Sequence, residues 1–324
     1  MHQADGIRVT VLVENWIDIL VGEEEFIGRP GLVHHFDPKN QVVHAEGGLS
    51  LFVESFTDGR RHCVLFDAGL GPDVIVHNFS ALGIDPEHVD QIVISHGHLD
   101  HHGGLETILP LIGHPVPVVI HPDAFLPRYA IMGDRQIAPY YNRPLARERL
   151  EELGARWVLT RQSVPVAPGI LTTGEIPLET EFEGPPPADT PITYDPGLYQ
   201  IRDGVFGLDR VTDEQGLVAN VRGEGLAVIT GCGHLGVVNT IRQARRVTGV
   251  EDLALVMGGF HLGFPGTPQE RIERTTDALA ELPVKRIVPM HCSGFACMTQ
   301  VAAKMPDQFL LYTVGMTIEV GEVG

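Results

Sequence analysis

The decapeptide Ser-His-Gly-His-Leu-Asp-His-His-Gly-Gly at residues 95–104 constrains this chain more than any other feature of the sequence. It places three imidazoles and a carboxylate close together, at His96, His98, Asp100 and His101. The apolar run before it indicates a buried strand, and the paired glycines at its end indicate the start of a helix. A loop at the carboxyl end of a strand can direct several side chains at one point. Because imidazole and carboxylate ligands together suit zinc, iron(II) or manganese, the pattern predicts a metal site. A histidine-rich surface loop without a fixed metal is the alternative.

Three later segments repeat this design, because each places a histidine at or just after the end of an expected strand. They contain His234, His261 and His291, and each histidine has glycines nearby. Side chains from equivalent strand ends can meet at one edge of a sheet, and glycines let the backbone pass close to a metal. We therefore expect these histidines to join the decapeptide. A polar residue that merely lies near the surface is the alternative at each position.

The residues next to these histidines lead to further predictions. Cys232 lies two positions before His234, so in an extended segment both point the same way. Cys232 is then either a soft metal ligand or bridging group, or buried apolar filler. Ser293 shares a face with His291 and is expected to reach the substrate, whereas Cys292 should face the opposite side. Residues 231–236 also match the dinucleotide pattern G-x-G-x-x-G, but no acidic residue ends the next strand, which argues against nucleotide binding.

Strand and helix patterns alternate along most of the chain, which predicts an α/β architecture in one domain over residues 1–324. Residues of about 122–200 differ, and we interpret them as a cap-like insertion. They contain Arg128-Tyr129, Tyr140-Tyr141-Asn142-Arg143 and a proline cluster at 185–187. The tyrosines and arginines either contact an aromatic or anionic ligand or are solvated loop residues, and we favour the second interpretation.

Composition narrows the classes of partner. The chain has 42 acidic and 23 basic residues, a net charge of −19, so a surface that binds nucleic acid is disfavoured and a small-molecule substrate is expected. No apolar run approaches the roughly 20 residues of a membrane helix, and the amino terminus does not resemble a signal peptide. The four cysteines lack the spacing of a disulfide framework, which favours a cytoplasmic location. A homo-oligomer is compatible with these observations.

The decapeptide resembles the H-x-H-x-D-H signature of the metallo-β-lactamase superfamily, and residues 65–69 resemble the strand-Asp-x-Gly element of that family. The resemblance implies a four-layer αββα sandwich with a two-metal site at one sheet edge. Segments at 174–177, 213–215, 230–234, 258–261 and 291–294 are similar to the branch described as dihydropterin-methyl-ribofuranosylaminobenzene-phosphate synthase. That branch implies pterin transfer chemistry in some members, while many relatives are described as metal-dependent hydrolases.

The resemblance also implies a ligand set. One metal would be held by His96, His98 and His234, and the other by Asp100, His101 and His291. Asp67 is expected to orient a ligand histidine. The family pattern has a glycine-aspartate pair that supplies a bridging carboxylate, and this chain has Gly231-Cys232 there. A thiolate bridge, a bridge by water alone and weaker occupancy of one metal all stay open.

These features predict a binuclear hydrolase in which a metal-activated hydroxide attacks a small ester, lactone or phosphoester. Asp100 and His261 are the candidate catalytic residues, and His261 and Ser293 are the candidate substrate contacts. Two divalent ions are expected, zinc first, with manganese or iron as alternatives. One alternative function is a transferase that joins a pterin methyl diphosphate to an arylamine ribose phosphate with loss of pyrophosphate. Another is a non-catalytic, metal-dependent ligand-binding protein.

Overall fold

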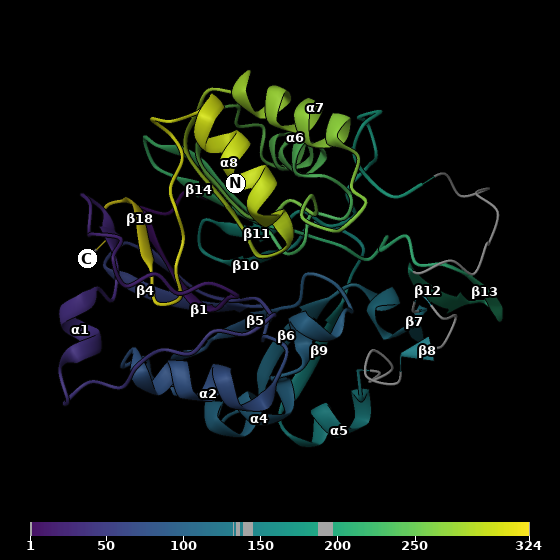
Figure 1. Cartoon of the computed structure of the whole chain (residues 1–324). Helices are drawn as coiled ribbons and strands as arrows, with labels where there is room; N and C mark the ends of the chain where they lie inside the picture. Colours follow the sequence, from purple (N-terminus) through teal and green to yellow (C-terminus); the bar gives the residue numbers. More distant parts are fainter. Residues whose placement is uncertain (1, 132, 134–136, 139–144, 187–196, 324) are drawn as a thin grey trace.

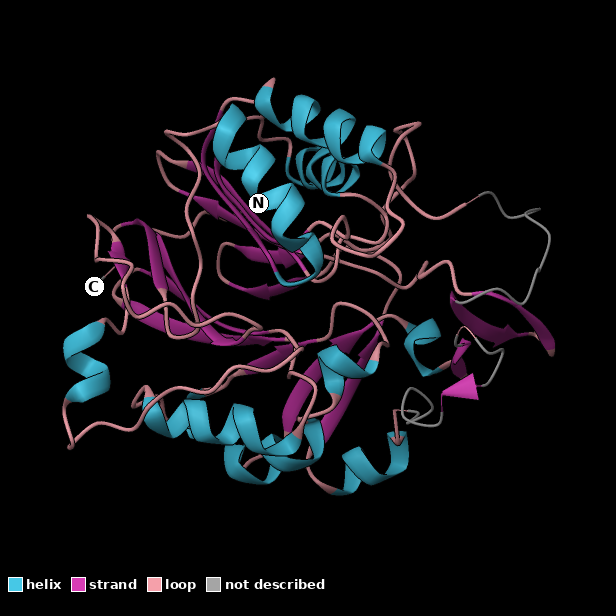
Figure 2. Cartoon of the chain, in the orientation of Figure 1, coloured by secondary structure: helices cyan, strands magenta, loops and turns pink. Residues whose placement is uncertain are grey.

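A computed structural model describes residues 2–131, 133, 137–138, 145–186 and 197–323. Two large β-sheets lie face to face, and helices cover the outer face of each, so four layers follow one another in the order αββα (Figures 1 and 2). The predicted four-layer architecture is confirmed.

The first sheet contains the amino-terminal half of the chain and, at one side, the carboxyl-terminal strand. Four neighbouring strands of this sheet are parallel, namely β4, β5, β6 and β9. Its outer face is covered by α2 (Pro72–Ala81), α4 (Leu105–Ile112) and α5 (Arg147–Glu152). The strand predicted just before the decapeptide is present as β5, whereas the pairing of β18 with β1 was not anticipated. The order across the sheet is β2 (Ile27–Gly28), β18 (Thr317–Gly321), β1 (Gly6–Val13), β3 (Ser50–Thr57), β4 (Arg60–Phe66), β5 (Gln91–Val93), β6 (Val116–Ile120), β9 (Ala155–Leu159).

The second sheet contains the carboxyl-terminal half. Its outer face carries α6 (Val237–Thr248), α7 (Gln269–Ala280) and α8 (Gly294–Lys304). Strands β14 and β15 form an antiparallel hairpin, and β15, β16 and β17 are parallel. The order is β10 (Pro165–Ala167), β11 (Ile170–Thr172), β14 (Leu217–Val221), β15 (Gly225–Thr230), β16 (Leu253–Gly259), β17 (Val284–Met290).

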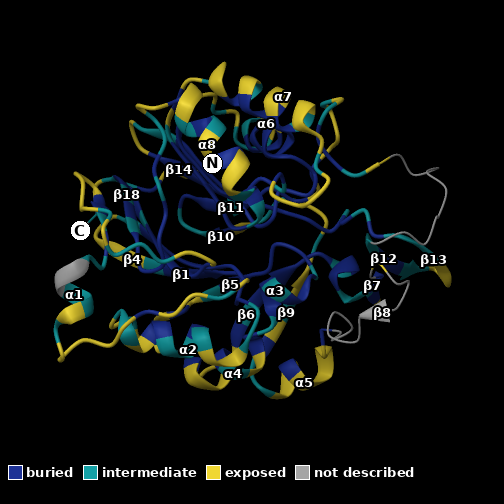
Figure 3. Cartoon of the chain, in the orientation of Figure 1, coloured by how far each residue is buried: buried dark blue, intermediate teal, exposed yellow. Residues whose placement is uncertain are grey.

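Successive side chains of a strand point to opposite faces of the first sheet, and both faces carry a hydrophobic core. In β4, Val64 and Phe66 face the second sheet, while Leu65 between them packs under α2 and α4. This is the two-residue period of a strand whose faces are both covered. Each such fully buried side chain contributes roughly 1.5–3 kcal/mol. Figure 3 shows the result, with buried strands in the middle and exposed residues on the outer faces of the helices.

The predicted cap region, residues 122–200, is only partly separate from these sheets. It supplies β9, β10 and β11 to them, and it also begins a third, smaller sheet that reaches residue 208. Residues 139–144, which contain the Tyr-Tyr-Asn-Arg segment interpreted as solvated loop, and Pro187 lie outside the described residues. The small sheet has the order β13 (Val205–Leu208), β12 (Gly197–Arg202), β7 (Arg128–Ile131), β8 (Ile137–Ala138).

The remaining described elements are short. They are α1 (Leu32–Phe36), α3 (Leu99–His102) and the 3₁₀ turns Pro86–His88, Pro122–Phe125 and His291–Ser293. Among the helices of the described residues, none has the length and apolar character needed to span a membrane. The carboxyl ends of β4, β5, β15, β16 and β17 are where the predicted site residues leave the two sheets.

Candidate metal centre

The decapeptide leaves β5 and winds into the single turn of helix α3, which holds Asp100 and His101. His234 follows β15, and His291 follows β17 directly. The predicted ligands therefore come from strand ends of both sheets. His291 has φ 53°, a left-handed conformation that is uncommon outside glycine and that clusters at functional sites.

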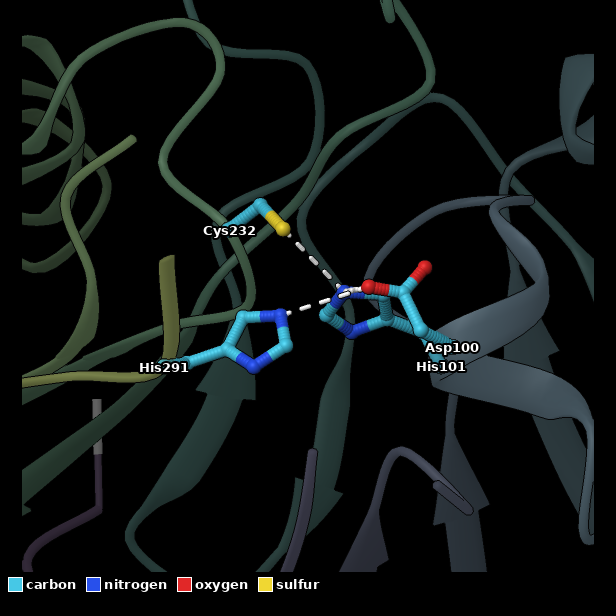
Figure 4. A group of neighbouring side chains, drawn as sticks. All are labelled: Asp100, His101, Cys232 and His291. Carbon is cyan, nitrogen blue, oxygen red and sulfur yellow. Dashed lines mark hydrogen bonds and ion pairs between the residues drawn. The ribbon is translucent and has the colours of Figure 1, made fainter. Parts of the chain in front are cut away.

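One group of ligand atoms consists of Asp100, His101, Cys232 and His291, whose atoms all lie within 4.8 Å of one another (Figure 4). Asp100 Oδ2 lies 3.5 Å from His101 Nε2 and 3.4 Å from His291 Nε2. Cys232 Sγ lies 3.2 Å from His101 Nε2. The three residues predicted for the second metal are thus together, and a thiol joins them.

The second group consists of His96, Cys232 and His234, again within 4.8 Å. The ring of His98 lies beside it, with its centroid 4.5 Å from that of His96 and 4.8 Å from that of His234. Cys232 belongs to both groups, so its sulfur lies where the family pattern would place a bridging ligand. His96, His98 and His234 are brought together as the resemblance implied.

The donor atoms fit a cation, because several are buried and have no hydrogen-bond partner among the described residues. A buried polar atom without a partner costs about 1–3 kcal/mol, and bound metal would remove that cost. Burial, reinforced by the neighbouring imidazoles, holds the pKa of His96 and of His234 well below the usual value, so both are neutral, the form that binds metal. The unpartnered atoms are His96 Nε2, Asp100 Oδ1, His234 Nε2, His291 Nδ1 and His291 Nε2.

The group that contains Asp100 and His291 differs from this in charge. Burial raises the pKa of Asp100, but His101 and His291 outweigh burial and hold it well below the usual range. For His291 burial lowers the pKa, but Asp100, Cys292 and Glu14 outweigh it and raise the pKa to about 10. Without a cation this pair is therefore an ion pair, and a metal would replace the proton of the imidazole.

Asp67 lies behind the ligands, at the end of β4. Its Oδ2 is 2.7 Å from His101 Nδ1 and accepts a hydrogen bond of 2.7 Å from Ser95 Oγ. Its φ of 61° turns the carboxylate back toward the decapeptide. The carboxylate therefore contacts the ring edge of His101 opposite to the ligand group, which is the position expected of a residue that orients a ligand.

The residues flanking His261 and His291 differ from expectation. Ser293 is fully buried, its hydroxyl accepts from Phe260 N at 3.0 Å, and it is not among the residues that line the cleft, so its contact with substrate stays a prediction. Cys292, expected to face away, lies with Cys232 and His261 within 4.8 Å. The 3₁₀ turn at residues 291–293 causes both changes, because it interrupts the alternation of a strand.

A buried ionic network behind His98 was missed by the sequence analysis. His98 Nε2 lies 3.1 Å from Asp209 Oδ2, which also accepts a 2.7 Å bond from Arg128 Nε. Arg128 Nη2 donates to Asp213 Oδ1 at 2.5 Å, and Asp213 Oδ2 accepts from Gly97 N at 2.8 Å. Arg128 is therefore buried and paired, which corrects its interpretation as a solvated loop residue. A lone arginine followed by tyrosine gave no signal of this.

Two buried glutamates support the loops from the other side. Glu14 accepts from His291 N at 2.7 Å, and burial raises its pKa to about 7. Glu214 accepts from Gly233 N at 2.6 Å and Leu235 N at 2.8 Å. Those two amides belong to the dinucleotide-like turn, so a carboxylate of the chain already occupies the place where a pyrophosphate would bind. The sequence-based argument against nucleotide binding at this turn agrees with that contact.

A cleft of about 490 Å³ opens beside both ligand groups. His261 lines it, with φ 51° and its ring 3.9 Å from that of His234. Its Nδ1 is buried without a hydrogen-bond partner among the described atoms. The opposite wall comes from the small sheet and the loop after it, through residues such as Ile131, Leu198 and Leu208. The predicted substrate contact at His261 thus has a cavity beside it.

Comparison with known proteins agrees with this geometry. A model of the metallo-beta-lactamase superfamily matches residues 45–291. A 7,8-dihydropterin-6-methyl-4-(beta-D-ribofuranosyl)-aminobenzene-5'-phosphate synthase of Methanocaldococcus jannaschii is 34% identical over 301 residues, 92% of this chain and 98% of that protein. The crystal structure of a metal-dependent hydrolase of the beta-lactamase superfamily superposes with a TM-score of 0.71 at 25% identity, over 98% of this chain and 100% of the other. Zn²⁺-bound PqqB from Methylobacterium extorquens has a TM-score of 0.52 at 13% identity, over 97% and 100%.

The synthase comparison corrects the predicted reaction. The expectation of a hydrolase is wrong, because the relative that shares 34% of residues over nearly its whole length is named a synthase. The prediction failed because histidine and aspartate ligands identify a metal site, and a metal can activate a leaving group as readily as water. The ligand pattern alone therefore does not separate hydrolysis from group transfer.

Proposed function

The chain belongs to the metallo-β-lactamase superfamily, and we propose that it is a metal-dependent synthase within it. The proposed reaction joins a pterin methyl diphosphate to an arylamine ribose phosphate. A bond forms between the amine nitrogen and the methylene carbon, the carbon–oxygen bond to the diphosphate breaks, and pyrophosphate and a proton leave. The observation that carries this proposal is the 34% identity, over 92% of the chain, to a protein named for such a product.

The ligand groups support a role for two divalent ions, and we propose zinc. His96 and His234, with His98 beside them, would hold one ion, and Asp100, His101 and His291 would hold the other, with Cys232 in both groups. A bound ion would act as a Lewis acid that stabilises the charge of the leaving diphosphate. The nitrogen-rich donor set with one shared thiol suits zinc.

The other polar groups supply positioning and proton transfer. We propose that His261 accepts the proton of the arylamine nitrogen, because it lines the cleft and its Nδ1 is without a partner among the described atoms. Asp100 is the weaker candidate for this role, since His101 and His291 both hold its carboxylate in the ionised, ligand-forming state. The apolar wall opposite favours planar organic substrates and restricts access of water to the cleft.

The proposal is tested by incubating metal-loaded protein with a pterin methyl diphosphate, with and without the arylamine, and measuring pyrophosphate. We expect release that depends on the arylamine and matches product formation one to one. Release at the same rate without acceptor would contradict the proposal and indicate hydrolysis. Absence of turnover with either mixture, in protein shown to contain metal, would favour the ligand-binding alternative.

A pair of variants adds specificity to this test. His261→Gln is expected to lower turnover at least a hundredfold while metal content stays unchanged, since general acid–base catalysis contributes about 10²–10⁴-fold. His114→Gln makes the same chemical change at an exposed position between α4 and β6, and should leave turnover unchanged.

The four cysteines are free thiols, which supports our proposal of a reducing, cytoplasmic location.

A further inference from the structure

The cleft beside the ligand groups carries charges that the metal centre does not explain. Two arginines line it, Arg210 from the loop after β13 and Arg271 from the first turn of α7. They reach the cavity from different parts of the fold, one from the small sheet and one from the helical layer over the second sheet. In a chain of net charge −19, guanidinium groups with a free face toward a cavity are informative.

Arg210 has no ion pair with any described residue. It is half-buried, and its Nε atom is buried without a hydrogen-bond partner. Its neighbour Asp209 pairs with Arg128 and His98, so the nearest carboxylate in the sequence is already engaged. A buried donor on a charged group that lacks an acceptor costs free energy unless a ligand provides one.

Arg271 is in a similar situation. One of its nitrogens, Nη2, donates to the carbonyl of Gly184, and no carboxylate of the described residues forms an ion pair with it. Burial lowers the pKa of Arg271, and the charge of Glu183 offsets that effect only in part. The carboxylate of Glu183 accepts from Val238 N and Asn239 N at the start of α6, so it is engaged elsewhere.

Two other arginines that lie near the interior are engaged by the protein itself. Arg128 forms ion pairs with Asp209 and Asp213, and half-buried Arg286 donates to the carbonyl of Glu319. Arg210, in contrast, has neither an ion pair nor an acceptor for its buried Nε among the described residues, and it lines the cleft beside the metal centre.

We propose that Arg210 and Arg271 form an anion site that binds the phosphate or diphosphate group of the substrate. The proposal deepens the synthase function and rests on it for the identity of the substrates. Planar guanidinium groups bind phosphate oxygens through pairs of N–H donors. Aromatic rings lie close by, since the ring of Phe264 is 4.5 Å from that of His261, so a planar ring system fits between the anion site and the ligand groups.

The test is calorimetric titration of the metal-loaded protein with inorganic pyrophosphate. We expect Arg210→Met and Arg271→Met each to weaken binding at least tenfold, which corresponds to about 1.4 kcal/mol. The matched control is Arg274→Met, one turn farther along α7, where the arginine pairs with Glu181 and Glu270 outside the cleft. This control should bind pyrophosphate within twofold of the unmodified protein, and equal weakening in all three variants would overturn the proposal.

Arg271→Lys keeps the charge and loses the forked geometry, so it guards against a folding defect in Arg271→Met. It should bind pyrophosphate with intermediate affinity, and its thermal unfolding midpoint should match that of the unmodified protein. Undiminished binding in both methionine variants, in a protein that still makes product, would refute the anion site and leave the synthase intact. Binding that depends on both arginines, in a protein that joins no pterin to arylamine, would refute the synthase and leave the anion site standing.

Discussion

Replacing Arg128 with methionine would leave two buried carboxylates, Asp209 and Asp213, without the guanidinium that pairs with both. The side chains of these three residues are at most 5% exposed. Arg128 donates to Asp209 Oδ2 at 2.7 Å, to Asp213 Oδ1 at 2.5 Å and to the carbonyl of Ala124 at 3.0 Å. Methionine fills similar volume but donates no hydrogen bond, so the change isolates the charge from the packing.

The expected loss of stability is large. Removal of one partner from a buried ion pair typically costs about 3–5 kcal/mol, because the remaining charge stays buried without compensation. A domain is stable by about 5–15 kcal/mol in total, so this single change should remove roughly a fifth or more of the stability. Combining it with Asp209→Asn and Asp213→Asn removes the three charges together and should recover most of the loss.

The measurement is urea unfolding at pH 7, in the presence of a chelator so that lost metal does not enter the comparison. Arg161→Met is the matched control, because Arg161 also pairs with two carboxylates, Asp123 and Glu175, but is 48% exposed. Exposed pairs contribute about 0–1 kcal/mol. If Arg128→Met costs no more than Arg161→Met, burial does not set the strength of this network and our reasoning is wrong.

Three further predictions concern the centre and its supports. Cys232→Ser should lower the metal content by about one ion per chain, because the sulfur lies in both ligand groups. Elemental analysis measures the metal content, with buried Cys63→Ser as the control. Full metal content in Cys232→Ser would contradict a bridging role. Asp67→Asn keeps a residue that tolerates the left-handed backbone and should weaken metal affinity about 10–100-fold in competition with a chelating dye; unchanged affinity would mean that His101 needs no orienting partner. Burial raises the pKa of Asp123, but hydrogen bonds from two arginines outweigh burial and lower it. The contribution of Asp123 to stability is therefore present above the pKa of the unfolded chain, about 3.9, and is lost as the pH falls through the pKa of the folded protein. Asp123→Asn should therefore cost about 1 kcal/mol in urea unfolding at pH 7 and much less near pH 3, and a loss independent of pH would refute this assignment.

The sequence was sufficient to predict the strand ends and the histidines placed on them. Residues 92–94 and 287–290 are short and apolar, and a histidine follows each within two residues. Parallel strands in one sheet bring their carboxyl ends to the same edge, so local patterns were enough to place these histidines at strand ends. They were not enough to show that β5 and β17 belong to different sheets. The two-sheet arrangement itself came from resemblance to a known family, because no local pattern specifies how two sheets face each other.

The network around Arg128 could not be predicted, because its members are far apart in sequence. Asp209 and Asp213 lie 81 and 85 residues after Arg128, and although the segment 213–215 was noted for its resemblance to the synthase branch, nothing in it pointed to Arg128. Burial of such residues depends on the fold of the small sheet, which places Arg128 on β7 and Asp209 just after β13. A charge pattern along the chain contains no information on that juxtaposition.

The same limit explains why the reaction was predicted wrongly while the ligands were placed together. The histidines and the aspartate determine which kind of metal the site can bind, and these ligands are recognised from local sequence patterns. Whether water or an amine reaches the reacting carbon depends on the walls of the cleft, which come from Ile131, Leu198 and Leu208 in the small sheet and from α7. For the proposed reaction, a wall of that kind would favour an organic acceptor over water. Exchange of its apolar residues for polar ones should therefore raise the ratio of pyrophosphate released to product joined, and an unchanged ratio would show that the wall does not select the acceptor.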